Sequence, residues 1–145
     1  PEYVADLRAF IKRNNLEPQV SLIGPVFGDE KKYWYRRAWV TVVPSYSEVI
    51  GMVNLEASSL ECPTITTVNT GLSDWEEGGG LLIRPDVNDL VKSIKYIADW
   101  SQDERENRGK ASYNLVKNRY SWQVVSREWA DLYSELLNER ECYAD

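Results

Sequence analysis

The chain has 145 residues, and its 43% hydrophobic and 12% aromatic content is enough for a folded core, which excludes a disordered segment. Its net charge of −6 argues against a nucleic-acid groove, which needs clustered lysine and arginine. No apolar run is long enough to cross a membrane, the two cysteines suit a reducing compartment, and the chain has no histidine to serve as general base or metal ligand. We therefore expect a single cytoplasmic domain over residues 1–145 with no nucleic-acid partner.

The predicted elements alternate between helices and strands. In chain order they are a helix over 2–14, a strand over 19–24, a helix over 29–38, a strand over 39–45, a helix over 51–61, a strand over 63–68, a turn with a short helix over 71–77, a strand over 80–85, and helices over 87–100, 104–120 and from 122 onward, with Ser121 as N-cap. This alternation predicts βαβ units and an α/β fold, Rossmann-like, with a parallel sheet and flanking helices. Because the chain begins inside a predicted helix, we also expect it to be a fragment of a longer protein.

The segment from Val42 to Glu56 carries the chemistry. An apolar strand ends at a Pro-Ser turn, Glu48 follows, Gly51 opens a helix, and Glu56 stands eight positions after Glu48. A helix N-terminus reached from a strand is an anion site, since its amides and dipole point at the ligand, and Gly51 lets the backbone approach closely. Two carboxylates would repel a phosphate unless they faced hydroxyl groups. The arrangement therefore predicts a nucleotide-sugar site.

The same residues resemble a known family. Glu48 to Glu56 matches the Glu-x7-Glu signature of retaining GT-B glycosyltransferases of family four, the glycosyl transferases group 1, and the likeness extends over nearly the whole chain. Further matching segments are Val20–Val26, Ala38–Val40, Val43–Ser45, Glu56–Pro63, Thr70–Leu72, Gly80–Leu82, Pro85–Val87 and Tyr120–Trp122. The resemblance identifies the chain as similar to the C-terminal, donor-binding domain of that family, lacking its first two strands and the acceptor-binding N-terminal domain.

The resemblance implies a role for each site residue. Glu48 would act at the donor sugar as the catalytic residue, Glu56 would accept hydrogen bonds from the ribose, and Val26 would border the base. The amides of Ile50, Gly51, Met52 and Val53 would hold sugar and phosphate oxygens. The implied reaction transfers a sugar, with retention, from a nucleotide-diphosphate sugar to an acceptor hydroxyl in glycan or polysaccharide biosynthesis.

The implied partners follow from the same likeness. They are the nucleotide-sugar donor and an acceptor glycan, lipid or small molecule bound by the missing N-terminal domain. A peripheral membrane location is compatible with the expected full-length protein. No Asp-x-Asp triplet occurs, so we expect no metal site, and no cofactor is implied. The resemblance places the two missing strands centrally, which would leave strand edges unpaired. Either the strand over 19–24 pairs there instead, or another segment or chain fills the gap, and self-association is one of these expected outcomes. The isolated chain is expected to be inactive.

Other interpretations of these residues stay open. Glu48 could simply be a favourable charge at a helix N-terminus, and Glu56 an ordinary exposed helical residue. The chain could equally be a non-catalytic nucleotide-binding or assembly module with the same fold. Glu61 replaces a glycine that is usual in the family, so we expect a local change at the end of the 51–61 helix. Five tryptophans are predicted to pack in the core or between domains: Trp34, Trp39, Trp100, Trp122 and Trp129.

Overall fold

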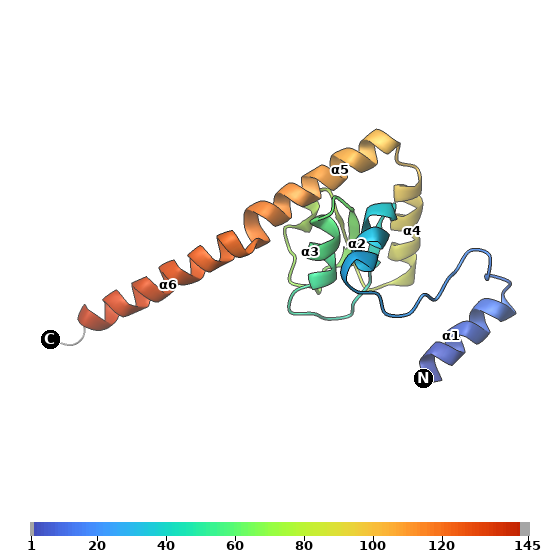
Figure 1. Ribbon diagram of the computed structural model, residues 1–145, viewed down its shortest axis with the longest axis horizontal. Helices are drawn as coiled ribbons and strands as arrows, with labels where there is room; N and C mark the ends of the chain where they lie inside the picture. Colours follow the sequence, from blue (N-terminus) through green and yellow to red (C-terminus); the bar gives the residue numbers. More distant parts are fainter. Residues whose placement is uncertain (1, 143–145) are drawn as a thin grey trace. The chain divides into compact units, whose positions relative to one another are not determined.

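The computed structural model describes residues 2–142, with side chains as far as residue 138. It contains two compact units, residues 1–31 and residues 32–145, and the boundary falls within helix α2 (Gly28–Arg37) (Figure 1). Each unit is described by itself below. The expectation of one domain over 1–145 stays a prediction.

The first unit contains helix α1 (Glu2–Arg13), as predicted, and the segment that leads into α2. The strand predicted over 19–24 is absent, which corrects that prediction. A strand needs a neighbour for its amide and carbonyl groups, and no strand is present in the described part of this unit. Its apolar side chains are accordingly exposed, with Val20 at 40% and Ile23 at 51%. An apolar run of this length therefore does not identify a strand by itself.

The second unit is built on a parallel sheet of three strands in the order β1-β2-β3. The strands are β1 (Thr41–Val43), β2 (Thr64–Thr67) and β3 (Leu81–Ile83), each shorter than its predicted range. Thr41 pairs with Thr64, and Ile65 pairs with Leu81. The α/β class with a parallel sheet and flanking helices is confirmed. Strands β1 and β3 each keep one outer edge, and self-association through these edges stays a prediction.

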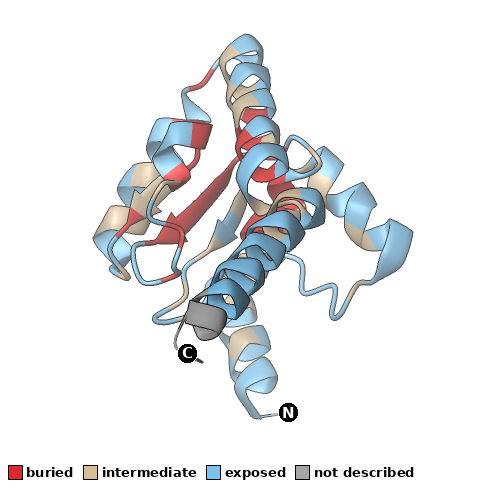
Figure 2. Cartoon of the chain, turned by 90° about the vertical axis from the view of Figure 1, so that its left-hand side faces the viewer, coloured by how far each residue is buried: buried red, intermediate tan, exposed pale blue. Residues whose placement is uncertain are grey.

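Helices cover both faces of the sheet. Helix α3 (Met52–Ser58) and helix α5 (Gln102–Leu115) contribute to one apolar cluster, together with the 3-10 turn η1 (Trp75–Gly78). Helix α4 (Val87–Ala98) packs on the other face. The first cluster consists of Leu55, Leu72, Trp75, Leu115 and Val116, and the second of Ile65, Ile83, Ile97 and Trp100. Figure 2 shows the buried residues concentrated on the sheet and the helix faces that meet it.

The central strand β2 is unusual because three of its four residues are threonines, and all four are fully buried. Each threonine hydroxyl has a partner. Thr64 accepts a hydrogen bond from the Trp75 indole at 2.7 Å, Thr66 accepts one from the Asn54 amide at 3.0 Å, and Thr67 donates to a backbone carbonyl. Because a buried hydroxyl without a partner is costly, these bonds fix the surroundings of β2 on both faces.

The end of α3 keeps the backbone conformation that glycine would adopt. Glu61 has a φ of +58°, so it takes the left-handed conformation despite its side chain, and the expected local change is wrong. The carbonyl oxygen of Glu61 lies so close to Gly109 of α5 that a Cβ there would stand 2.2 Å from it. The packing of α5 against this turn holds Glu61 in place.

After α5 the chain makes a π-helical turn, Val116–Tyr120, and continues as helix α6 (Trp122–Cys142), which extends away from the sheet (Figure 1). Trp100 is buried as predicted, whereas Trp122 is 82% exposed and Trp129 is 54% exposed. Among residues 2–142, no helix combines the length and the apolar character that crossing a membrane requires.

Candidate functional site

The loop between β1 and α3, residues 44–51, carries the predicted catalytic carboxylate. Glu48 is half-buried, and its Oε1 accepts a hydrogen bond from the hydroxyl of Ser45. Its Oε2 lies 3.3 Å from the position that a Cβ on Gly51 would occupy. The structure therefore brings Glu48 and Gly51 together at the start of α3, as the sequence predicts.

Three hydrogen bonds fasten this loop to the last residue of β2 and to the segment that follows it. The Thr67 hydroxyl donates to the Ser45 carbonyl at 2.5 Å. The Asn69 side chain donates to the Tyr46 carbonyl at 3.0 Å, and the Glu48 amide donates to the Asn69 carbonyl at 3.1 Å. The backbone around Glu48 is thus held by the end of β2 and by Asn69, which follows it.

Gly71 completes this junction. Its φ is +66°, and a Cβ on it would lie 2.2 Å from the carbonyl oxygen of Val49, the residue after Glu48. No side chain fits there, so the two loops cross with their backbones in direct contact. A glycine is therefore needed both for conformation and for space.

Gly51 is the N-cap of α3, with φ −76° and ψ 78°, and it is buried. A Cβ on Gly51 would stand 2.4 Å from the side-chain nitrogen of Asn54. Asn54 is fully buried, and among residues 2–142 the structure offers no partner to its Oδ1 atom. The glycine predicted for close backbone approach is thus also required by the packing beneath it.

The four predicted donor-binding amides are not equivalent. The Met52 amide donates to the Ile50 carbonyl at 2.9 Å, so it already has a partner. In the described part of the chain, the amides of Ile50, Gly51 and Val53 have no hydrogen-bond partner. Three of the four amides at this helix start are therefore without a hydrogen-bond partner in the described part of the chain, and one of them belongs to the buried Gly51.

Glu56 lies on the outer face of α3 and is half-buried. The hydroxyl of Tyr35, on the part of α2 that belongs to the second unit, donates to its Oε2 at 3.2 Å. Burial and then the charge of Glu56 raise the pKa of Tyr35 to about 12. Sequence reasoning missed Tyr35, because 21 residues separate it from its partner; the aromatic-rich stretch over 33–35 was the only signal.

Val26 belongs to the first unit and is half-buried there. Its predicted place beside a nucleotide base stays a prediction. Among the described residues, no cluster of three or more potential metal ligands occurs.

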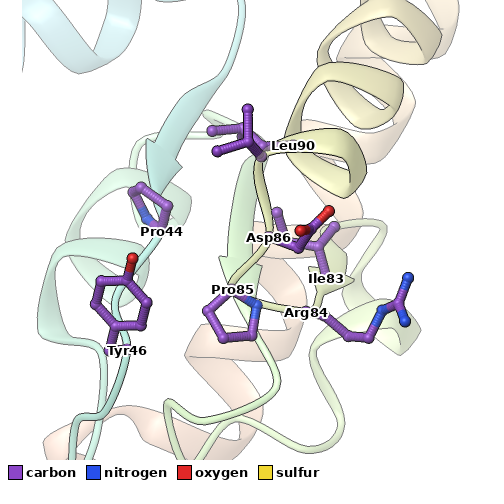
Figure 3. Close-up of a pocket in the computed structure, with 8 residues that line it drawn as sticks. Pro44, Tyr46, Ile83, Arg84, Pro85, Asp86 and Leu90 are labelled. Atoms are coloured by element: carbon purple, nitrogen blue, oxygen red, sulfur yellow. The ribbon is translucent and has the colours of Figure 1, made fainter.

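A pocket of about 260 Å³ opens where β1 and β3 end, beside the loop that carries Glu48 (Figure 3). Its charged groups are already engaged. Arg84 donates to both carboxylate oxygens of Asp89, at 2.7 and 3.0 Å, and Asp86 caps α4 through the amides of Asn88 and Asp89. The pocket is lined by Pro44, Tyr46, Ile83, Arg84, Pro85, Asp86, Val87 and Leu90.

Comparison with protein families identifies the chain. Residues 1–115 match the model of the glycosyl transferases group 1. The chain belongs to this family. A relative from Staphylococcus aureus, the capsular polysaccharide biosynthesis glycosyltransferase CapM, is 31% identical over 111 residues, which are 74% of this chain and 29% of that protein.

Two solved structures share the fold of this chain. The sucrose-phosphate synthase from Thermosynechococcus elongatus matches 92% of this chain with 34% of its own, at 29% identity and a TM-score of 0.77. A glycosyltransferase from Rickettsia africae matches 94% of this chain with 37% of its own, at 18% identity and a TM-score of 0.81, which supports the fold alone. The GT-B, Rossmann-like assignment is confirmed. The chain spans about a third of the length of these proteins.

Proposed function

We propose that the natural protein containing this chain transfers a sugar from a nucleotide-diphosphate sugar to an acceptor hydroxyl with retention of the anomeric configuration. The chain is its donor-binding part, and the acceptor is bound elsewhere in the protein. The observation that carries the proposal is the position of Glu48, whose carboxylate stands against the backbone of Gly51 at the start of α3. Membership of the glycosyl transferases group 1 supports the same reaction.

In the proposed mechanism, Glu48 faces the donor sugar and stabilises the positive charge that develops at its anomeric carbon. The bond from Ser45 and the fastening of the loop hold this carboxylate before the donor binds, so little reorganisation is needed. The unpartnered amides of Ile50, Gly51 and Val53 take up the negative charge of the departing diphosphate. The Met52 amide would contribute only after releasing the Ile50 carbonyl.

Glu56 has a different task in this mechanism, because it accepts hydrogen bonds from the ribose hydroxyls of the donor. The two carboxylates then contact different parts of the donor: Glu48 contacts the sugar and Glu56 contacts the nucleoside. Removing Glu48 should therefore impair turnover, and removing Glu56 should impair nucleotide binding.

We would test the proposal on the full-length natural protein, by calorimetric titration with UDP, GDP and ADP and by turnover of the corresponding nucleotide sugars. Glu56→Ala should weaken nucleotide binding about tenfold or more, since it removes a charged hydrogen-bond acceptor. Glu48→Gln should leave nucleotide affinity nearly unchanged and lower kcat by about a hundredfold or more. The configuration of the product, followed by NMR, tests retention.

Glu76 provides the matched control, because it is an exposed carboxylate on η1 outside the loop, and Glu76→Gln should change neither quantity. Nucleotide binding that is abolished by Glu56→Ala, without turnover of any nucleotide sugar, would favour the second candidate, a non-catalytic nucleotide-binding module. Binding of no nucleotide by the wild-type protein would refute the donor site itself.

A further inference from the structure

The pair formed by Tyr35 and Glu56 links two helices at the proposed donor site. The Tyr35 hydroxyl donates to Glu56 Oε2 at 3.2 Å, and both side chains are half-buried. The neighbours of Glu56 on α3 that face the core are Asn54, Leu55, Ala57 and Ser58, so Glu56 projects from the opposite face. A glutamate side chain on an outer helix face can adopt several rotamers, and the hydrogen bond from Tyr35 favours those that keep Oε2 within its reach.

The chemistry of the pair suits a permanent contact. Burial, reinforced by the charge of Glu56, raises the pKa of Tyr35 to about 12, so the phenol keeps its proton at neutral pH and acts as a donor. A carboxylate accepts hydrogen bonds at about four lone-pair positions. One phenol and the two hydroxyls of a ribose can therefore bind the same carboxylate together.

We propose that Tyr35 is a positioning residue of the donor site, whose hydroxyl holds the Glu56 carboxylate in the orientation that receives the ribose diol. The inference rests on the proposed function, because it takes the ribose as the partner of Glu56. It adds a residue from α2, outside the Glu-x7-Glu segment, to the determinants of nucleotide recognition. Tyr35 does not touch the nucleotide; it acts through Glu56.

The test uses the full-length protein and whichever of UDP, GDP and ADP binds most tightly, compared with its 2′-deoxy and 3′-deoxy forms. Tyr35→Phe keeps the ring and removes only the hydroxyl. We expect it to weaken binding of the ribonucleotide about three- to tenfold, because a hydrogen bond that orients a charged acceptor is lost. Binding of the deoxynucleotides should change less, so the preference for ribose over deoxyribose should fall.

Two further variants separate positioning from folding. Tyr33→Phe is the matched control, since Tyr33 lies on the same helix, is 52% exposed and makes ring contacts with Trp34 and Arg37 that do not need its hydroxyl. This variant should bind like the wild type. In a Glu56→Ala background, Tyr35→Phe should have no further effect, because the group that it positions is gone.

The outcomes distinguish the inference from the proposed function. If Tyr35→Phe weakens ribose and deoxyribose nucleotides equally, or leaves both unchanged, while Glu56→Ala still abolishes the ribose preference, the positioning role is refuted and the donor site stands. If the wild-type protein shows no ribose preference, or Glu56→Ala leaves it intact, the assignment of ribose to Glu56 fails and the inference fails with it. Thermal unfolding of each variant checks that the fold is retained.

Discussion

Replacing Gly71 by alanine would test how the loop that carries Glu48 is held. Gly71 follows β2 in the left-handed conformation, and an added Cβ would lie 2.2 Å from the carbonyl oxygen of Val49. That separation must grow by about 1 Å to become an ordinary contact, and both groups belong to backbone, so no side-chain rotation relieves the overlap. Because Val49 directly follows Glu48, the displacement reaches the proposed catalytic carboxylate.

The expected loss of stability has two parts. An alanine in the left-handed conformation costs about 1–2 kcal/mol. Overpacking against a backbone atom adds about 1–3 kcal/mol. The less flexible unfolded chain offsets about 0.4–1 kcal/mol of this cost. The net destabilisation should therefore lie at about 1–4.5 kcal/mol, and a shift of about 1 Å at Glu48 should lower kcat by about a hundredfold.

Gly79→Ala is the control for this prediction. Gly79 lies in the same unit with a φ of +77°, but a Cβ there would meet Arg108 at no less than 3.2 Å. Its cost should be mainly conformational and its effect on kcat small. Urea denaturation measures the free energy of unfolding of both variants, and turnover of the nucleotide sugar measures the rate. Equal losses of stability in the two variants, or an unchanged kcat in Gly71→Ala, would refute the tight crossing of the two loops.

Two further predictions concern stability. Glu61→Gly should raise the free energy of unfolding by about 0.5–1 kcal/mol, because glycine adopts the left-handed conformation without strain. Ser59→Gly, at a right-handed position of the same turn, should lower the free energy of unfolding and serves as the control. Urea denaturation measures both variants, and a loss of stability in both would contradict the argument. Burial alone would raise the pKa of Asp74, but hydrogen bonds from Tyr120 and Arg119 hold that pKa below its usual value. The ionised Asp74 and its two partners therefore stabilise the fold at neutral pH, and this contribution is lost as the pH falls from about 4 through the lowered pKa. Tyr120→Phe should therefore be less stable at neutral pH and lose less stability on acidification than the wild type, measured by urea denaturation near neutral pH and near pH 3; parallel acid profiles would show that the Tyr120 bond does not set this pH dependence.

The sequence predicted the elements whose pattern depends on near neighbours. Helix α4 appears where Leu90, Ile94 and Ile97 repeat with helical spacing, and the β-branched run over 64–67 forms the central strand. The predicted strand over 19–24 did not form although the segment is also apolar and contains β-branched residues, because pairing with another strand is not encoded in the segment itself. The predicted strands extended beyond the observed ones at both ends for the same reason.

In the candidate site, too, only features within one short segment could be predicted from the sequence. The sequence placed Glu48 and Gly51 together, since both lie in one short segment. It did not identify Tyr35, which meets Glu56 only through the packing of two helices. It also treated the four amides alike, whereas a local bond to the Ile50 carbonyl occupies that of Met52.

The fastening of residues 45–49 by Thr67, Asn69 and Gly71 has a practical consequence for protein engineering. The two stretches, 44–51 and 67–71, behave as a single module although helix α3 and most of strand β2 lie between them in the chain. A chimera that takes only residues 44–51 from a relative would lose the matching contacts with Thr67, Asn69 and Gly71. Donor preference should therefore be exchanged by transplanting both stretches at once.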